Sequence, residues 1–408
     1  MNDIVLVTID SWRRDSIARM PNLSKRTDEW NTATGVSHSS KTYLAFPSML
    51  ASSLPTASYD DSGSLVPDVN PLPRVLSEAG YSTGGFIASN PNVQQWEQYF
   101  DTFWNDGIAD ATEQYTSKIE KWRKRILKTV LMRKQVSAET VARRAKQWYV
   151  STNGPRFLWM HLMEPHFPYY PGIRKAADVG LFSSYQTTVD FHRHREAVAD
   201  EHRDTLEALY YKTVERLDDQ IGSILDFLDD DATVVITGDH GEEFQHDVAT
   251  HDHLYEECVT VPLLTNNLPS VSGVEYLRHL DIAPTILDRL GIDPPAEWEG
   301  DVAREVSTKH PVRMANILGK AVYTGVRTDD RKILKTFETD GSTAIEWYDL
   351  ANDPAEQHDL SERSEPPEML SKELDAFIDS NDLDTVRQDA EQFISDVATD
   401  RLEELGYV

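Results

Sequence analysis

The sequence contains a single cysteine, Cys258, and no apolar run that approaches the length of a membrane span. One cysteine excludes an internal disulfide framework and a metal site built from several cysteines. Basic residues are also few, because 40 Lys and Arg stand against 69 Asp and Glu, for a formal net charge of −29. This balance argues against a nucleic-acid-binding protein, since a phosphate backbone requires a large cationic surface.

The N-terminal residues 4–9 form an apolar run that is similar in composition to the core of a signal peptide. The run has no basic segment before it and no small-residue cleavage site after it, and it leads directly into Asp10. We therefore interpret it as a buried β-strand and expect a cytoplasmic protein. The acidic excess suits a salt-rich cytoplasm, so a halophilic origin is a further hypothesis.

A chain of 408 residues predicts two or three domains, and 39% hydrophobic with 27% charged residues is typical of a globular protein. Continuous apolar runs alternate with helical patterns. The predicted strands are residues 4–9, 81–89, 157–163, 233–237 and 261–264, and the predicted helices include 21–30, 71–80, 200–228 and 282–290. This alternation predicts an α/β fold in which helices cover both faces of a mostly parallel sheet.

The pattern changes after about residue 310, where short alternating runs occupy residues 322–327, 332–336 and 344–350. Such runs with turn residues between them predict a small antiparallel sheet. An acidic helical segment follows. We therefore divide the chain into a catalytic α/β domain (1–308), a small C-terminal α+β subdomain (309–360) and an acidic helical tail (361–408).

One segment departs from the overall charge, with eight Lys and Arg residues between positions 118 and 134, interleaved with apolar residues. A basic amphipathic helix can lie on an anionic membrane surface or gather an anionic substrate. The alternative, which we favour, is a solvated helix whose apolar stripe packs on the domain.

Chemically reactive side chains follow two of the predicted strands. Asp10 comes directly after residues 4–9, and Asp239 and His240 follow residues 233–237. In open α/β sheets, ligands bind beyond the carboxyl ends of the strands, so these groups are expected in one crevice. Two carboxylates and an imidazole predict a divalent metal site, although each residue alone is more often a helix cap or a satisfied polar group.

The sequence around these residues resembles that of a known family. Residues 237–244 read Thr-Gly-Asp-His-Gly-Glu-Glu-Phe, and residues 254–264 contain Leu-Tyr-Glu-Glu followed by Val-Pro-Leu-Leu. These segments resemble the second signature region of the sulfatase family, within the alkaline phosphatase superfamily. Further segments match in the same order, namely residues 7–15, 20–23, 157–161, 165–169, 281–287 and 347–354. The resemblance covers residues 3 to about 360 and implies an alkaline-phosphatase-like fold.

The sequence departs from the family at the nucleophile. The sulfatases of this family convert a cysteine or serine to formylglycine, and the equivalent position here is Thr42. Phe46 replaces the arginine of the motif, and Ser11 replaces a second metal-binding aspartate, so formylglycine chemistry is not expected. The Lys41-Thr42 pair instead resembles the threonine-nucleophile branches of the superfamily, such as nucleotide phosphodiesterases and lipoteichoic-acid synthase. The ordinary alternative for Thr42 is a hydroxyl that caps the helix through Met49.

The resemblance implies that Asp10, Thr42, Asp239 and His240 hold a divalent metal ion, which is Mn, Mg, Ca or Zn. Direct coordination would activate the Thr42 hydroxyl, which then forms a covalent phosphothreonine intermediate. We expect a single ion.

The same resemblance implies that His166 and His251 bind the ester oxygens or protonate the leaving group, with support from Lys41. The local spacing also permits His253 in place of His251. For His161 a core role is expected, and for Asn90 a turn explains its presence as well as substrate contact does.

The leading prediction is a metal-dependent hydrolase of phosphate or sulfate esters, with phosphate favoured by Thr42. One alternative is a phosphoglycerol-type transferase that acts on an anionic lipid or glycan, and a less favoured one is a sulfatase that works without formylglycine. An isomerase of the phosphoglycerate-mutase type is disfavoured because no extra domain is evident between Thr42 and Asp239. The expected partner is an anionic ester substrate, not nucleic acid, and the oligomeric state stays open.

Overall fold

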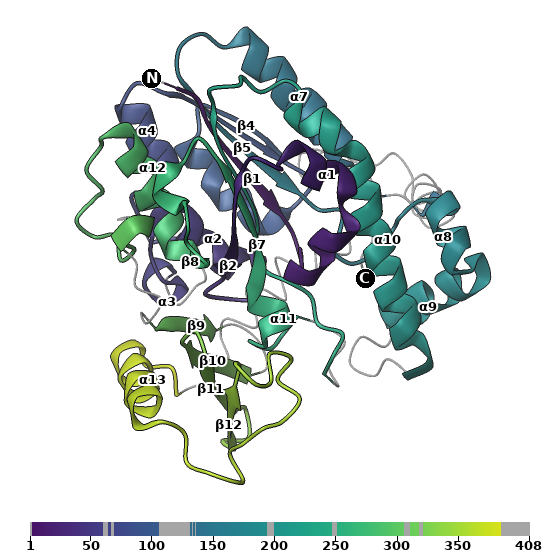
Figure 1. Ribbon diagram of the computed structural model, residues 1–408, viewed down its shortest axis with the longest axis vertical. Helices are drawn as coiled ribbons and strands as arrows, with labels where there is room; N and C mark the ends of the chain where they lie inside the picture. The colour runs from purple at the N-terminus through teal and green to yellow at the C-terminus, as the bar shows by residue number, and fades with distance from the viewer. Residues whose placement is uncertain are drawn as a thin grey trace.

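The computed structural model describes residues 2–59, 64–66, 69–105, 131–132, 134, 136–193, 200–246, 251–305, 311–317 and 321–384. Its strands form two sheets, one of eight strands in the order β4-β3-β5-β1-β6-β7-β2-β8 and one of four in the order β12-β11-β10-β9 (Figure 1). The strands of the large sheet are β1 (Ile4–Ile9), β2 (Asn31–Val36), β3 (Ser82–Ile87), β4 (Thr102–Asn105), β5 (Arg156–Leu162), β6 (Thr233–Gly238), β7 (Thr260–Asn266) and β8 (Tyr276–Arg278).

Helices cover both faces of the large sheet, and a further helix covers the small one. The α-helices are α1 (Pro21–Arg26), α2 (Thr42–Ala51), α3 (Pro55–Ser58), α4 (Leu72–Glu78), α7 (Ala138–Ser151), α8 (Ile173–Val179), α9 (Leu181–Arg193), α10 (Asp200–Leu225), α11 (Glu256–Val259), α12 (Ile282–Leu290) and α13 (Glu368–Asn381). The 3-10 helices are η1 (Arg14–Arg19), η2 (Pro91–Tyr99), η3 (Pro269–Val271), η4 (His279–Asp281) and η5 (Ala303–Glu305). None of the helices in the described part of the chain has the length and apolar character that a membrane crossing requires.

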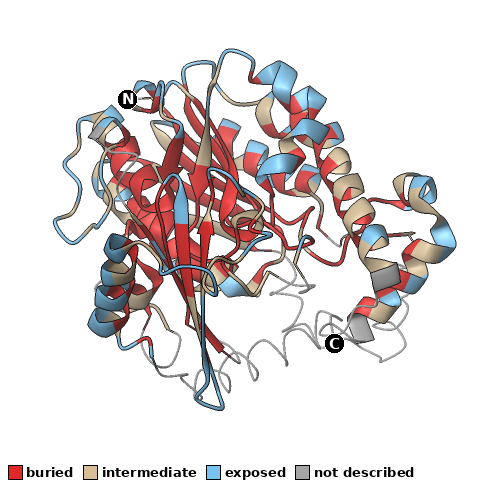
Figure 2. Cartoon of the chain, turned by 60° about the horizontal axis from the view of Figure 1, so that its bottom comes forward, coloured by how far each residue is buried: buried red, intermediate tan, exposed pale blue. Residues whose placement is uncertain are grey.

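The central strand β1 is buried on both faces because alternate side chains enter different apolar cores. Val5 and Val7 pack with side chains of α7 and α10, whereas Ile4 and Leu6 pack with those of α2 and α12. Figure 2 shows the central strands as an almost uninterrupted buried layer between the two sets of helices. This arrangement confirms the predicted α/β fold with a mostly parallel sheet.

One side of the large sheet differs from a purely parallel arrangement. Strand β7 runs antiparallel to both β6 and β2. The sequence of β2, Asn-Thr-Ala-Thr-Gly-Val, has no apolar alternation, so it was not predicted as a strand. Within it, a Cβ on Gly35 would lie only 2.8 Å from Val261 Cγ2, so the close approach of β2 to β7 requires glycine at this position.

The small sheet is antiparallel, as predicted, and consists of β9 (Val312–Asn316), β10 (Ala321–Arg327), β11 (Arg331–Glu338) and β12 (Thr343–Asp349). Helix α13 covers it through Leu370, Leu374 and Phe377. The predicted domain boundary at 308/309, residues 118–130 of the basic segment, and the tail after residue 384 lie outside the described residues.

A buried ionic cluster joins the small sheet to the large domain. Lys332 on β11 has no exposed surface, and its Nζ lies 2.9 Å from Glu356 Oε1 and 3.2 Å from Glu256 Oε1. Arg327 on β10 binds both oxygens of Glu256, at 2.8 and 3.0 Å. Burial raises the pKa of Glu256, but Arg327 and Lys332 outweigh that effect and hold its pKa at about 2.

We predict that Lys332→Met destabilises the protein by about 3–5 kcal/mol, because two buried carboxylates lose their shared cation. The measurement is the free energy of unfolding in urea at pH 7. The matched control is Lys372→Met, since Lys372 pairs with Glu368 while its side chain is 74% exposed, and a change within about 0.5 kcal/mol is expected there. Equal effects of the two substitutions would contradict a structural role for the cluster.

The same cluster predicts a pH dependence. Because the folded pKa of Glu256 lies below its ordinary value of 4.5, its ionised form stabilises the fold above pH 4.5. This contribution is lost as the pH falls from 4.5 towards 2. Between pH 4.5 and 2, the unfolding free energy of Glu256→Gln should therefore fall less than that of the wild type. Unfolding free energies measured at several pH values in this range check the prediction.

Candidate active site

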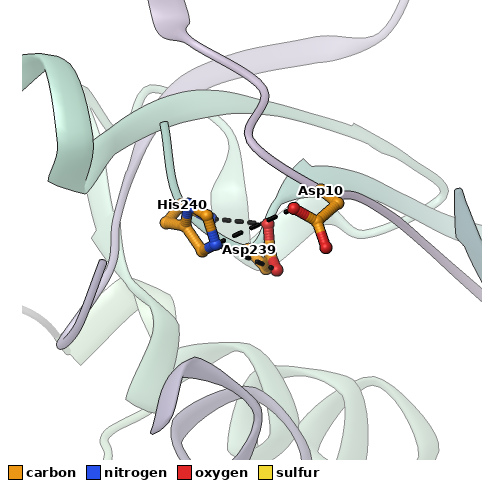
Figure 3. A group of neighbouring side chains, drawn as sticks. All are labelled: Asp10, Asp239 and His240. Atoms are coloured by element: carbon orange, nitrogen blue, oxygen red, sulfur yellow. Dashed lines mark hydrogen bonds and ion pairs between the residues drawn. The ribbon is translucent and has the colours of Figure 1, made fainter. Parts of the chain in front are cut away.

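The register of the large sheet places two aspartates side by side. Strand β1 pairs with β6 so that Ile9 lies opposite Gly238, and the next residues along the two strands are Asp10 and Asp239. The pairing continues past the strand ends, because the Asp239 amide donates to the Ile9 carbonyl at 3.3 Å. With His240, these aspartates form a fully buried group whose side chains point toward one another (Figure 3).

The hydroxyl of Thr42 completes this group. Thr42 is the first residue of α2, and its Oγ1 lies 3.2 Å from Asp10 Oδ2 and 3.2 Å from His240 Nε2. The N-cap residue of α2 is Lys41, and no side-chain hydrogen bond caps the helix there. The Thr42 hydroxyl therefore does not serve as the cap, and it contacts Asp10 and His240 instead. The four residues predicted to hold a metal ion are therefore adjacent in the structure.

His240 presents a lone pair to this group. Its Nδ1 lies 2.8 Å from the Gly241 carbonyl oxygen, which can only accept, so Nδ1 carries the proton and Nε2 is free to accept. Burial lowers the pKa of His240 to about 3, which keeps the ring neutral at pH 7. Nε2 lies 3.6 Å from Asp239 Oδ2 and 3.8 Å from Asp10 Oδ1.

The two aspartates have opposite electrostatic environments. Burial raises the pKa of Asp10, but the surrounding histidines lower it well below its ordinary value, beginning with His166. Burial and the neighbouring charge of Asp10 raise the pKa of Asp239 well above its ordinary value, and Asp239 Oδ2 has no hydrogen-bond partner. Two buried carboxylates with an unpartnered oxygen, a neutral imidazole and a hydroxyl fit a divalent cation.

A buried hydrogen-bonded chain supports Asp10 from behind. Asn90 Nδ2 lies 3.4 Å from Asp10 Oδ2 and 3.3 Å from His161 Nε2. His161 Nδ1 in turn lies 2.9 Å from Thr8 Oγ1, which also accepts from Trp159 Nε1. His161 is thus a core histidine that contacts the site. Asn90 has two functions, because its Oδ1 also accepts from the Asn92 amide at the start of η2.

The predicted substrate histidines lie at different places. The His251 ring stacks on the His240 ring, with centroids 4.6 Å apart, and the His166 ring lies 5.9 Å from His251. The His253 ring instead packs against Tyr323 of the small sheet at 4.7 Å. The geometry therefore favours His251 over His253, a choice that the sequence spacing left open. Burial lowers the pKa of His166 to about 4.

Two further residues orient this part of the site. Glu242 Oε1 lies 2.9 Å from His251 Nδ1, and Asp252 pairs with the ammonium group of Lys41. Neither carboxylate was predicted. Glu242 lies in the same signature segment as Asp239, so its position was visible in the sequence, whereas its contact with His251 depends on the path of the intervening loop. Lys41 lies next to Thr42 but its ammonium group is engaged by Asp252.

The mostly parallel sheet, with a buried group of carboxylates, imidazole and hydroxyl at its strand ends, defines an alkaline-phosphatase-like α/β protein. Residues 2–292 match the family described as Sulfatase, and the chain belongs to the sulfatase family.

Individual relatives are distant. The N-acetylglucosamine-6-O-sulfatase of Bacteroides thetaiotaomicron is 25% identical over 182 residues, which cover 38% of this chain and only 32% of that protein. Among solved structures, a protein bound to its substrate D-glucosamine-2-N,6-O-disulfate matches with a TM-score of 0.70 at 14% identity, over 95% of this chain and 99% of that chain. The phosphonate monoester hydrolase of Agrobacterium radiobacter matches with a TM-score of 0.67 at 15% identity, over 94% and 96% of the chains. These structures establish the shared fold.

The opposite environments of the two aspartates predict opposite effects on stability when divalent cations are removed with a chelator. Asp239→Asn should raise the melting temperature, because it removes a buried charge and offers an amide N–H to His240 Nε2. Asp10→Asn should lower the melting temperature, because its amide N–H would face the Thr42 and Asn90 donors. The expected loss of unfolding free energy is about 1–3 kcal/mol. Thermal unfolding in chelator checks both, and a lower melting temperature for Asp239→Asn would contradict this description.

Proposed function

We propose that the protein is a metal-dependent hydrolase of phosphate esters that forms a covalent intermediate on Thr42. The observation that carries this proposal is the Thr42 hydroxyl, which lies 3.2 Å from both Asp10 Oδ2 and His240 Nε2 at the first residue of α2. A helix N-terminus also favours negative charge, which stabilises an anionic oxygen at this position.

The residues around Thr42 argue against formylglycine chemistry. Oxidation of a threonine side chain gives a ketone and not the aldehyde of formylglycine, because the carbon that bears the hydroxyl also carries a methyl group. Phe46, at the position of the family's arginine, packs edge-to-face on Trp159 and His161 at 4.9 and 5.1 Å. An apolar ring in the core thus replaces a cation of the sulfatase site, so a phosphate ester is favoured over a sulfate ester.

Asp10, Asp239, His240 and Thr42 would hold the metal ion, which is Mn, Mg, Ca or Zn. When bound, such an ion lowers the pKa of the hydroxyl and offsets negative charge on the transferring group. Asn90 and His161 keep the Asp10 carboxylate in place. Glu242 orients the His251 ring beside His240.

The reaction proceeds in two displacements. Thr42 Oγ1 first releases its hydroxyl proton to water. The deprotonated Oγ1 then attacks phosphorus, so that an Oγ1–P bond forms while the bond from phosphorus to the leaving alcohol breaks. His251 donates the proton that the leaving oxygen requires. His166 would bind an ester oxygen in its protonated form, which the negative charge of a bound phosphate favours. A water molecule then attacks phosphorus, His251 takes a proton from that water, and the Oγ1–P bond breaks to return Thr42 with a deprotonated Oγ1.

Thr42→Ala should lower kcat by at least about 10³-fold, because the covalent route is lost, whereas Thr42→Ser should keep measurable turnover. The assays use p-nitrophenyl phosphate, bis-p-nitrophenyl phosphate, p-nitrophenyl phenylphosphonate and p-nitrophenyl sulfate in high potassium chloride, with each divalent metal in turn. Sulfate turnover that survives in Thr42→Ala would mean that the nucleophile lies elsewhere and that the protein is a sulfatase.

A second prediction tests His251 as the proton donor. Because p-nitrophenolate departs without protonation, His251→Gln should reduce its release by less than about tenfold, but should reduce alkyl phosphate hydrolysis by about 10²–10⁴-fold. Values of kcat/KM for p-nitrophenyl phosphate and glycerol phosphate provide the comparison. His253→Gln is the matched control and should affect both substrates alike. If His253→Gln, and not His251→Gln, slowed glycerol phosphate hydrolysis selectively, the proton donor would be His253.

The transferase alternative is distinguished by its product. A phosphoglycerol-type transferase would pass its phosphoglycerol-like group to an added alcohol faster than to water, so product analysis in the presence of glycerol separates the two activities. The basic segment, which motivated contact with an anionic lipid, lies mostly outside the described residues. The hydrolase is therefore the function that we propose.

A further inference from the structure

Among the described residues, a second group of potential metal ligands lies apart from the catalytic group. Glu243, His246 and Glu257 each offer one ligand atom, and these atoms lie within 4.8 Å of one another. We propose that this group binds a second divalent cation, of the Mn²⁺ or Zn²⁺ type, that braces the loop between β6 and β7. Two carboxylate oxygens and one imidazole nitrogen suit such cations. The inference does not depend on the proposed reaction.

Glu243 provides the first independent support. Its side chain is almost completely buried, and its Oε1 has no hydrogen-bond partner. Its other oxygen lies 3.8 Å from the Cys258 thiol and 3.4 Å from His253 Nδ1. A buried carboxylate oxygen without a partner is costly, and a bound cation removes that cost. Without one, burial and the charge of Glu257 raise the pKa of Glu243 to about 9, so that it holds a proton.

His246 has the orientation of a metal ligand. Its Nε2 donates to the Glu356 carbonyl at 3.0 Å, which is the arrangement that orients metal-bound imidazoles. Its Nδ1 then faces Glu257 Oε1 at 3.0 Å. Two metal–ligand bonds of about 2.1 Å at a right angle place their donor atoms about 3.0 Å apart, so both atoms can bind one ion without movement.

The remaining contacts of Glu257 leave this oxygen, Oε1, one lone pair for an ion. Arg13 pairs with Glu257 Oε2 at 2.5 Å and so offsets one negative charge. The Phe244 amide donates to Oε2 at 2.9 Å and the Gln245 amide donates to Oε1 at 3.0 Å, and together they fix the orientation of the carboxylate. His246 and Glu257 both line an open cavity of about 800 Å³. The cavity provides a path for the ion and room for water molecules that complete its coordination.

The proposed ion would connect parts of the site that are distant in the sequence. The loop that carries Glu243 and His246 also carries His251, and Glu356 belongs to the buried ionic cluster that joins the small sheet to the large domain. Without an ion, His246 Nδ1 must carry a proton to donate to Glu257 Oε1. A cation that binds to Nδ1 must displace this proton. Metal uptake is therefore expected to release protons.

The test counts Mn²⁺ per chain by equilibrium dialysis and elemental analysis. Glu243→Gln and His246→Gln should each bind one ion fewer than the wild type, and His253→Gln, a neighbour on the same loop, should bind as many as the wild type. Asp239→Asn removes the catalytic ion and isolates the second site. In that background Mn²⁺ should raise the melting temperature, and addition of Glu243→Gln should abolish the increase.

Two results would overturn the proposal. One is an unchanged Mn²⁺ count in both Glu243→Gln and His246→Gln, and the other is a melting temperature of Asp239→Asn that does not respond to Mn²⁺. Because Glu243→Gln keeps the shape of the side chain, it keeps the test informative if His246→Gln does not fold. Failure of the Thr42 prediction would leave these counts unaffected, so the two proposals fail separately.

Discussion

The burial of two adjacent carboxylates at the ends of β1 and β6 is the constraint on which the rest of the site depends. The register that pairs Ile9 with Gly238 makes Asp10 and Asp239 neighbours, and both are fully buried. Ionised carboxylates in such a place repel each other and lose hydration, so a cation or a proton must accompany them. The register of the sheet thus makes a positive charge or a bound proton necessary beside Asp10 and Asp239.

The surrounding groups supply hydrogen bonds to only some of these carboxylate oxygens. Asn90 and Thr42 donate to Asp10, and backbone amides donate to Asp239 Oδ1, but Asp239 Oδ2 is left without a donor. His240 does not supply a charge, because burial and its bond to the Gly241 carbonyl keep it neutral with Nε2 as an acceptor. A set of acceptors around one unsatisfied oxygen is suited to a metal ion, and the Thr42 hydroxyl lies where such an ion would activate it.

Much of this was predictable from the sequence, for identifiable reasons. The apolar runs that become β1 and β6 end directly before Asp10 and Asp239, so strand prediction places each carboxylate at a strand end. That the two are adjacent depends on β1 and β6 being parallel neighbours in this register, which the strand pattern does not determine. Strand β2 was not predicted, because its polar residues are stabilised by pairing with β7 and β8 and not by their own pattern. The choice between His251 and His253 likewise depends on the path of a loop, which two residues of spacing cannot determine.

That loop is held by the small sheet as much as by the large one. Glu356, which follows β12, accepts from the Glu256 amide and from His246 Nε2, and its carboxylate pairs with the buried Lys332. His253 packs against Tyr323 of β10 on one side, while His251 stacks on His240 on the other. The antiparallel sheet therefore sets the position of the loop that carries His251. Because the proton donor that we propose must lie within hydrogen-bond distance of the leaving oxygen, the packing of this sheet contributes to the proposed catalytic geometry.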